Sequence, residues 1–464
     1  MTQSHWSTHM SNDPSHLREQ AARTLLDHPW IGAAGVATGG TVEVAPAAAA
    51  LAVTPVPGPL IEEYLDHWGE IYDWTYRTAA VRHAADLDLS GWTASDTGRP
   101  LPAAHMTEWV ERTVDLVLET SPRTVLELGC GTGLLAHRLS GRVLGYVGAD
   151  VAETAVGRLA AAGIPGAAFV RAAAHEAGGD AVRAALDTVA GADGRPDCVL
   201  LNSVTQCFPD LRYLRAVLLA AVELVAPGGT VVVGDVRHAG LLDAYCRWVE
   251  RAADPDAAPD VIADRAAARA QRDDELLFDP PALAAAVAGT SREVRFAVRA
   301  KTLTENTELT RYRFDAVLTV DPPAPPPEPG TVPWTDLAAH PDPLAALADR
   351  TAAGPVRVTG IPNAALLDRA DAVTAAALRA AAGTDTAVAL DPADPTALEV
   401  HHPAATAARP AHALPGPGQA HEPLHTFVER RLAEAARAHL RRHRPAAADV
   451  PVRVLPDAVP EVTG

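Results

Sequence analysis

Lysine is almost missing from this sequence: among 39 lysine and arginine residues, Lys301 is the only lysine. Any chemistry that needs a lysine amine must therefore use that residue. Cysteine is scarce too, because the 464 residues include only 4 cysteines, and no C-x-x-C spacing joins them. Such sparse and scattered cysteines exclude a disulfide framework and a zinc site, and they fit a reducing compartment. We therefore expect a cytoplasmic protein that holds no metal.

Long apolar runs and an excess of positive charge are also missing. A charge or a Pro-Gly break interrupts every stretch of about 18 otherwise apolar residues, so we expect no membrane span. The N-terminus is polar and lacks the pattern of a secretory signal. A net charge of −19 repels the phosphates of nucleic acids and disfavours a nucleic-acid partner. With 48% hydrophobic residues, the chain has material for two or three globular domains.

What is present is an alternation of helix-like and strand-like segments between residues 60 and 320. Such alternation is typical of parallel strands joined by crossover helices, which form an α/β sheet covered on both faces. Residues 293–298 and 312–320 alternate apolar and polar side chains and predict an antiparallel hairpin at the sheet edge. We expect strands at residues 124–128, 145–149, 168–172, 198–201 and 230–233, and helices at residues 60–79, 106–119 and from about residue 134.

Composition also indicates where linkers lie. The prolines within residues 55–59 and the proline-rich stretch 320–333 are typical of linkers. Residues 401–424 are again rich in proline, histidine and alanine, so we expect His401 and His402 to be exposed. We expect two further elements near the end of the chain, an arginine-rich amphipathic helix at residues 425–444 and a strand at residues 450–455.

A glycine loop follows the first predicted strand, in the run Thr124-Val-Leu-Glu-Leu-Gly-Cys-Gly-Thr-Gly-Leu-Leu135. Gly129, Gly131 and Gly133 let the backbone turn sharply and approach a ligand closely. A dinucleotide loop would need glycine where Leu134 stands. The G-x-G-x-G spacing suits S-adenosylmethionine, which has an amino-acid tail in place of a pyrophosphate, and Glu127 can lie near the ammonium group of that tail. The alternative is a tight turn with a purely structural role.

Two segments after the next strands predict the rest of the cofactor site. Asp150 ends the second strand, where a carboxylate accepts both ribose hydroxyls, and we assign Val151 beside it to the same site. Capping of the helix that begins near residue 153 is the alternative for Asp150. At the end of the third strand, Glu176 can accept from the adenine amino group and the Ala174 backbone can bond the ring. A solvated loop is the alternative for this segment.

Polar residues follow the fourth and fifth strands, at the edge where open α/β sheets bind ligands. Asn202, Ser203 and Gln206 are uncharged hydrogen-bonding groups that can fix the cofactor and hold a nucleophile. Asp235 can orient or deprotonate an acceptor amine, and Arg237 can pair with a carboxylate or phosphate. The alternatives are a polar loop that caps nearby backbone, and a structural ion pair for Asp235 and Arg237.

Several motifs together resemble one family, the methyltransferase domains embedded in nonribosomal peptide synthetases. The resemblance covers residues 60–320 and extends more loosely to residue 390. Cys207 stands where this family usually has tyrosine, and Ala94 where it usually has serine, which points to a changed acceptor pocket. Besides the glycine loop, the motifs are Trp68-Gly-Glu-Ile-Tyr72, Gly91-Trp-Thr-Ala-Ser95, Met106-Thr-Glu-Trp109, Asn202-Ser-Val-Thr-Gln206-Cys-Phe-Pro209, Gly234-Asp-Val-Arg237 and Leu309-Thr-Arg-Tyr-Arg-Phe-Asp315.

The two ends resemble another part of the same synthetases. Residues 17–53 are similar to the start of the small C-terminal subdomain of an adenylation domain, and residues 432–464 to its end. The resemblance implies a methyltransferase excised with the flanks of its host, without adenylation activity. The flanks are expected to fold together as a small α+β platform that docks a carrier protein or synthetase. We therefore expect four parts, at residues 1–56, 57–330, 331–420 (a methyltransferase-associated region and linker) and 421–464.

The resemblance implies a class I S-adenosylmethionine-dependent methyltransferase, with S-adenosylhomocysteine as the product. The acceptor is then the α-amine of an aminoacyl or peptidyl group, either on a small molecule or tethered to a carrier protein. We expect Asp235, Asn202 and Gln206 near this amine and Tyr72 closing over the cofactor. One alternative is O- or C-methylation of a metabolite, although carbon acidity needs a base and His238 is the one well-placed histidine. The other alternative is a non-catalytic scaffold that binds the cofactor.

Overall fold

The computed structural model describes residues 14–54, 56–79, 85–190, 194–324, 327–414, 416 and 418–456. The chain divides into two compact units: unit 1 comprises Met1–His67 and Pro423–Gly464, and unit 2 comprises Trp68–Glu422. The division falls inside helix α2 (Pro59–Thr78). The four domain boundaries drawn from the sequence stay predictions. Pro55 and the last eight residues of the chain, 457–464, lie outside the described residues.

Unit 1 joins both ends of the chain in one α+β fold. Its sheet has the order β1-β2-β17, with β1 antiparallel to β2 and β17 parallel to β2. The Nε2 atom of His439 donates to the carbonyl of Thr24 at 3.1 Å, which links the two helices of the unit. The expected small α+β fold of the chain ends is thus confirmed. Its elements are α1 (Pro14–Leu25), β1 (Ile31–Val36), β2 (Val42–Pro46), α15 (Leu424–His443) and β17 (Val452–Val454).

The main sheet of unit 2 has eight strands in the order β15-β9-β10-β7-β6-β3-β4-β5. Its parallel part consists of β3 (Thr124–Leu128), β4 (Gly145–Asp150), β5 (Ala167–Arg171), β6 (Cys198–Asn202) and β7 (Thr230–Arg237). The antiparallel edge consists of β9 (Val294–Ala300), β10 (Arg313–Val320) and the short β15 (Arg409–Pro410). The predicted fold, a mostly parallel Rossmann-like sheet with an antiparallel hairpin at its edge, is confirmed.

The strand order fixes where a ligand can bind. From β3 the chain builds outward through β4 and β5, and it then returns to the other side of β3 to add β6 and β7. The order therefore reverses between β3 and β6, and open α/β sheets bind ligands at the carboxyl ends of the strands beside such a reversal. Leu126, Val147 and Leu200 are fully buried, as expected for strands covered on both faces.

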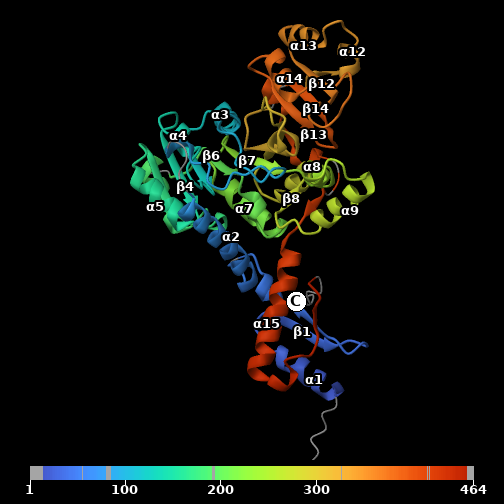
Figure 1. Ribbon diagram of the computed structural model, residues 1–464. Coiled ribbons are helices and arrows are strands. Elements are labelled where there is room, and N and C mark those ends of the chain that lie inside the picture. The colour runs from blue at the N-terminus through green and yellow to red at the C-terminus, as the bar shows by residue number, and fades with distance from the viewer. Residues whose placement is uncertain are drawn as a thin grey trace, which may run out of the picture. The chain divides into compact units, whose positions relative to one another are not determined.

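The helices of unit 2 that accompany the main sheet are visible around it in Figure 1. The helix expected from about residue 134 is only one turn long, α4 (Ala136–Leu139). None of the helices in the described ranges is long and apolar enough to cross a membrane. The other helices are α3 (Ala103–Glu119), α5 (Glu153–Ala162), α6 (Asp180–Ala190), α7 (Leu211–Leu224), α8 (Leu242–Ala253), α9 (Pro259–Ala270), α10 (Pro280–Ala286) and α11 (Glu308–Arg311).

Four strands within residues 330–402 form a second sheet, with the order β11-β12-β14-β13. The expectation that His401 is exposed is wrong, because its side chain is 1% exposed and bonds Glu399 on β14. Contacts of β13 with β9 place this sheet within unit 2. Its elements are β11 (Gly330–Pro333), α12 (Trp334–Ala338), α13 (Pro343–Ala352), β12 (Val356–Pro362), α14 (Ala375–Ala382), β13 (Ala387–Asp391) and β14 (Asp394–His402), and a separate short pair is formed by β8 (Leu277–Phe278) and β16 (Ala420–His421).

Candidate active site

The glycine loop lies between β3 and α4, at the carboxyl end of the sheet. Gly129, Gly131 and Gly133 have φ angles of +83°, +50° and +83°, which side-chain-bearing residues rarely adopt. A Cβ atom at Gly133 would lie 2.4 Å from Cδ2 of Leu159, so this position also lacks space for a side chain. The sequence therefore needs glycine here both for the backbone turn and for close packing against α5.

Asp150 anchors this loop at the end of β4. Its Oδ2 accepts the N–H of Gly131 and its Oδ1 accepts the N–H of Ala152, each at 2.8 Å. Burial raises the pKa of Asp150, and the backbone N–H groups act against that rise. Ala152 is itself the N-cap residue of α5, so capping of this helix by Asp150, the alternative interpretation, is not supported. A carboxylate offers about four acceptor sites, and Gly131 and Ala152 take two of them, so two ribose hydroxyls can still bind. Val151 follows directly and is half-buried.

Glu127 is buried in β3, at 3% exposure, and accepts a hydrogen bond from the hydroxyl of Tyr146 on β4. Burial raises the pKa of Glu127 to about 8, although the Tyr146 hydrogen bond partly offsets this. The carboxyl is therefore mostly protonated at neutral pH until a positive charge lies beside it. A ligand ammonium group near Glu127 would supply that charge.

An aromatic wall on α2 faces the glycine loop. The rings of Tyr72 and Tyr76 lie 5.7 Å apart, and a Cβ atom at Gly131 would be 3.0 Å from the Tyr76 hydroxyl. The Sγ of Cys207 lies 3.7 Å from the hydroxyl oxygen of Tyr72. The nearby Cys207 and burial raise the pKa of Tyr72 well above its usual value. Tyr72 is therefore an uncharged phenol, and Cys207, where the family usually has tyrosine, contacts it directly.

The segment after β5 fits a capping role. Glu176 is exposed, and its Oε2 accepts the N–H of Ala173 at 2.8 Å, closing a turn around Ala174. The neighbouring His175 bonds the hydroxyl of Tyr213 through Nδ1 at 2.8 Å. One oxygen of Glu176 is thus occupied by its own turn, as the solvated-loop alternative requires. Contact of Ala174 and Glu176 with an adenine ring stays a prediction.

The turn after β6 carries two buried acceptors without partners. Asn202 and Gln206 are 5% and 7% exposed. The Nε2 of Gln206 donates to the carbonyl of Ser203 at 2.8 Å, but its Oε1 accepts no hydrogen bond from the described residues. The Oδ1 of Asn202 is equally unpartnered in the described part of the chain. Because buried polar atoms are nearly always paired, these two oxygens indicate a donor supplied by a ligand or water.

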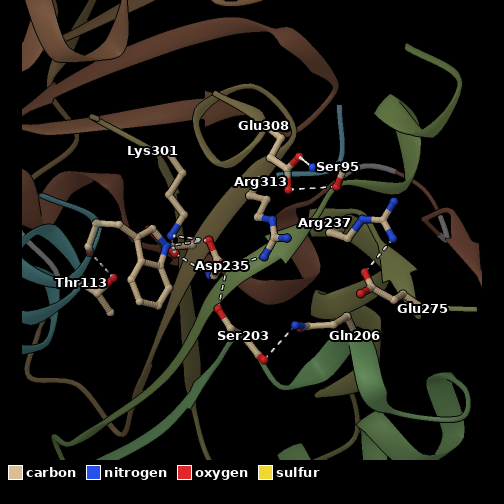
Figure 2. A network of polar contacts seen from close by, with 12 residues as sticks. Ser95, Thr113, Ser203, Gln206, Asp235, Arg237, Glu275, Lys301, Glu308 and Arg313 are labelled. Carbon is tan, nitrogen blue, oxygen red and sulfur yellow. Dashed lines mark hydrogen bonds and ion pairs between the residues drawn. The ribbon is translucent and has the colours of Figure 1, made fainter. Parts of the chain in front are cut away.

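Asp235 lies at the centre of a buried polar network (Figure 2). Its side chain is fully buried and accepts from Trp109 Nε1 at 3.0 Å and from Ser203 Oγ at 2.6 Å. Arg313 donates to the same carboxylate, and Lys301 Nζ lies 3.3 Å from it. Burial acts to raise the pKa of Asp235, but the charges of Arg313 and Lys301 outweigh burial and hold that pKa below its usual value. Four groups already bind the carboxylate and its pKa is lowered, so proton abstraction does not fit this geometry, and direct orientation of an acceptor amine by Asp235 stays a prediction.

Backbone geometry holds this network in place. Ser203 and Asp235 both have positive φ, 52° and 61°, an uncommon conformation for non-glycine residues. Gly234 and Asp235 together face the single residue Asp315 across the β7–β10 pair, which is a β-bulge. The N–H of Asp235 donates to Asp315 Oδ1 at 2.7 Å. The bulge thus directs the Asp235 side chain toward the end of β6.

Arg237 belongs to a different group of charges. Both its terminal nitrogens bond Asp273, at 2.9 and 2.8 Å, and one also bonds Glu275 at 2.7 Å. Its guanidinium lies 4.7 Å from the ring centre of Tyr245. This supports the structural ion pair as the role of Arg237, with Asp273 and Glu275 as partners in place of Asp235. A cavity of about 340 Å³ opens beside these residues.

Sequence reasoning missed the partners of Asp235. Lys301 was noticed only because it is the one lysine of the chain, while Trp109, Arg313 and Asp315 stand inside motifs that carry the family resemblance. The four residues come from α3, from the position directly after β9 and from β10, and only the folded sheet brings them to the end of β7. Two features of the sequence could have pointed to these partners of Asp235: the rarity of lysine, and their position inside the family motifs.

Comparison with known proteins finds similarity to methyltransferases and to nonribosomal peptide synthetases. Residues 126–231 match the family described as "Methyltransferase domain". The chain is 31% identical over 319 residues to chondramide synthase cmdD of Chondromyces crocatus, covering 65% of this chain and 8% of that protein. It is 33% identical over 380 residues to the probable non-canonical nonribosomal peptide synthetase CymA of Salinispora arenicola, covering 77% of this chain and 4% of that protein.

This chain therefore spans only a small part of these relatives. A solved structure, the N-methyltransferase NodS of Bradyrhizobium japonicum WM9, is 15% identical, with 47% of this chain and 98% of that chain covered at a TM-score of 0.29. That likeness is too weak to add to the fold described above. The family match and the two synthetase similarities confirm the resemblance drawn from the sequence motifs.

Proposed function

We propose that this chain, which carries a methyltransferase domain of the type found in nonribosomal peptide synthetases, methylates an amino group with S-adenosylmethionine. The acceptor is the α-amine of an aminoacyl or peptidyl group, held as a thioester on a carrier protein. The enzyme then acts in natural-product biosynthesis and releases S-adenosylhomocysteine. Three features support the proposal: the glycine loop, the unpartnered oxygens after β6 and the lowered pKa values of Asp235 and His238.

The glycine loop and its surroundings fit the cofactor. Asp150 keeps free acceptor sites for two ribose hydroxyls beside Gly131. Glu127 lies at the base of the loop, where an ammonium group would ionise its buried carboxyl. Tyr72 and Tyr76 supply an aromatic wall with uncharged hydroxyls. These groups match a ligand that joins a ribose to a positively charged amino-acid tail.

The observation that carries the proposal is the pair of unpartnered acceptors, Asn202 Oδ1 and Gln206 Oε1. Amide oxygens accept N–H donors, and an amine that is about to be methylated keeps N–H bonds to donate. We infer that these two acceptors, at the end of β6 next to β3, hold such an amine beside the glycine loop. Ser203 lies between them and bonds Asp235, so the turn that carries both amides is tied to the buried network.

Positioning accounts for most of the catalysis in this proposal. The bound cofactor supplies a methyl group on a sulfonium, whose sulfide is already an excellent leaving group. The protein must hold the amine in line with that methyl group and exclude water, and good alignment is worth about 7–11 kcal/mol in intramolecular reactions. The turn after β6 is fixed through the bond of Ser203 to Asp235, which Lys301 and Arg313 hold in turn. None of these charged groups needs to exchange a proton.

The charge state of nearby groups favours nitrogen as the acceptor atom. An α-amine beside a thioester is weakly basic, so much of it is neutral at working pH and needs no strong base. Oxygen or carbon acceptors need a base, yet the pKa of Asp235 is lowered and burial lowers the pKa of His238 to about 4. His238 Nδ1 already accepts the N–H of Gly240 at 3.1 Å. N-methylation is the reaction that these groups support best.

A transfer assay tests this proposal. The protein is incubated with S-adenosylmethionine and with aminoacyl groups loaded on a phosphopantetheinylated carrier protein, and the released product is fragmented by mass spectrometry. We expect one added methyl group on the α-nitrogen, and a loss of at least tenfold in rate when both Asn202 and Gln206 are changed to leucine. Methyl groups found on oxygen or carbon would overturn the choice of acceptor atom. Cofactor binding without transfer to any acceptor would support the scaffold alternative.

A further inference from the structure

The cavity beside Arg237 lies on the opposite side of β6 from the glycine loop. The sheet order puts β3, which leads into that loop, on one side of β6, and β7, which carries Arg237, on the other. The N–H of Leu276 donates to the carbonyl of Gln206 at 2.8 Å, so the cavity rim is joined to the turn after β6. A molecule whose amine contacts Gln206 can therefore extend into this cavity, away from the cofactor.

The size of the cavity fits one amino-acid side chain with a few waters. It measures about 340 Å³, near the lower end of the range of small-molecule sites. The cavities around Lys301 and around Glu399 measure no more than about 40 Å³. The larger cavity is thus the best-suited of these spaces for part of an acceptor.

The lining of the cavity is polar throughout. Every residue around it is charged or carries a hydroxyl group. Arg237 is held by Asp273 and Glu275, and Arg269 by Glu250 at 2.7 Å. Charges that are already paired define the walls, and an acceptor does not have to neutralise them.

Arg272 is the exception among the arginines of this lining. Within the described ranges its guanidinium has no hydrogen-bond or ion-pair partner, and the residue is exposed at the cavity. Asp274 lies at the same rim, where burial raises the pKa of its carboxyl. The rim therefore offers donors from Arg272 to whatever enters.

Polarity of the walls decides which side chain is accepted. An aliphatic or aromatic group would displace water from charged walls without replacing its hydrogen bonds, and unpaired polar groups are costly to bury. A hydroxyl or carboxamide group can replace that water bond for bond. Sites built to hydrogen-bond a substrate reject analogues without the polar group by large factors.

We propose that this cavity receives the side chain of the acceptor and selects aminoacyl groups with a hydrogen-bonding side chain over those with an aliphatic or aromatic one. Arg272 is the specificity-determining residue at its rim. The inference rests on the proposed function, since the entering group is an aminoacyl amine. It names the substrate class that the same site accepts.

Binding of unreactive acceptor mimics tests the inference without requiring turnover. N-alkyl amides of serine, asparagine, leucine and phenylalanine are titrated calorimetrically into protein saturated with S-adenosylhomocysteine. We expect the serine and asparagine amides to bind at least tenfold more tightly than the other two. Equal affinity for all four, a preference for leucine or phenylalanine, or no binding of any amide would overturn the inference.

Two variants make the test specific to the cavity. Arg272→Leu is expected to lower the affinity for the serine and asparagine amides at least fivefold and to leave the affinity for the leucine amide unchanged. Arg265→Leu is the matched control, because Arg265 lies on α9, is 48% exposed and pairs with Asp254 away from the cavity. If both variants had an equal effect on binding, Arg272 would not be the residue that determines specificity. Methyl transfer is measured separately on the same samples, so a failed preference is distinguishable from a failed methyltransferase.

Discussion

The ammonium of Lys301 lies 2.5 Å from Oδ1 of Asp315, and both side chains are almost fully buried. The only lysine of the chain therefore neutralises the carboxylate that also accepts the N–H of Asp235. Burial acts to lower the pKa of Lys301, but Asp315 and Asp235 outweigh it and keep the amine protonated. Two buried cations, Lys301 and Arg313, thus balance the two buried carboxylates, Asp235 and Asp315.

Lys301→Met removes that balance and leaves two buried carboxylates with Arg313 alone. We expect a loss of about 3–5 kcal/mol in the free energy of unfolding, the usual cost of breaking a buried ion pair. The double variant Lys301→Met/Asp315→Asn restores the charge count and should recover most of the loss. Urea unfolding measures both variants. The exposed Arg142→Met is the control, with an expected change within about 0.5 kcal/mol, and a similarly small change for Lys301→Met would contradict the network.

Asp235→Asn tests orientation against proton abstraction. The pKa of Asp235 is lowered in the folded state, so its stabilising effect is present above about pH 4 and is lost as the pH falls further. We expect the stability difference between wild type and variant to be constant from pH 5 to 8 and to shrink in stronger acid. The kcat profile of both proteins between pH 6 and 9 should have the same shape, with a lower plateau in the variant. Loss of a pH limb in the variant would mean that Asp235 is a base.

The raised pKa of Glu127 predicts that a proton is released when the cofactor binds. Its pKa of about 8 keeps the carboxyl mostly protonated at pH 7, and the ligand ammonium group would ionise it. Calorimetric titration with S-adenosylhomocysteine in buffers of different ionisation enthalpy should show close to one proton released at pH 7. The variant Glu127→Gln should release none from this position.

The raised pKa of Glu127 also predicts how the stability of the ligand-free protein depends on pH. Folded Glu127 binds its proton more tightly than the unfolded chain does, so stability falls as the pH rises from about 4.5 to about 8. Glu127→Gln should flatten this part of the stability curve, measured by urea unfolding at several pH values. A wild-type curve that rises across this range and is unchanged in the variant would contradict the raised pKa.

Gly133→Ala tests the need for glycine in the loop. The new methyl group combines a φ of +83° with a 2.4 Å approach to Leu159, and we expect a loss of about 1–3 kcal/mol in stability together with weaker cofactor binding. Gly157→Ala is the matched control. Gly157 lies in α5 with no atom within 4 Å of an added Cβ, so alanine should stabilise the helix by about 0.5–1 kcal/mol. Equal effects of the two changes would show that the loop tolerates side chains.

Local patterns explain what could be predicted from the sequence. Buried parallel strands are short apolar runs, so β3 and β6 stand out from the helices between them. The glycine loop and Asp150 are also local, because the turn that they form follows directly from a strand end. These patterns need no knowledge of distant residues.

Distant partners explain what could not be predicted. The network of Asp235 draws on Trp109 of α3, on Lys301 directly after β9 and on Arg313 of β10, and these residues meet only at the end of β7 in the folded protein. His401 was misjudged from its proline-rich surroundings. It shares a face of β14 with Glu399, two residues earlier, and the strand is covered on both faces there, because residues 398–401 are all buried.

The central claim is that the glycine loop and Asp150 bind S-adenosylmethionine. Calorimetric binding of S-adenosylhomocysteine to wild type, Asp150→Ala and the exposed control Asp264→Ala tests it most directly, with circular dichroism to show that each protein is folded. We predict micromolar binding, about −8 kcal/mol, in the wild type and the control, and its loss in Asp150→Ala. No binding by the folded wild type would contradict the methyltransferase assignment, and undiminished binding by Asp150→Ala would contradict the site.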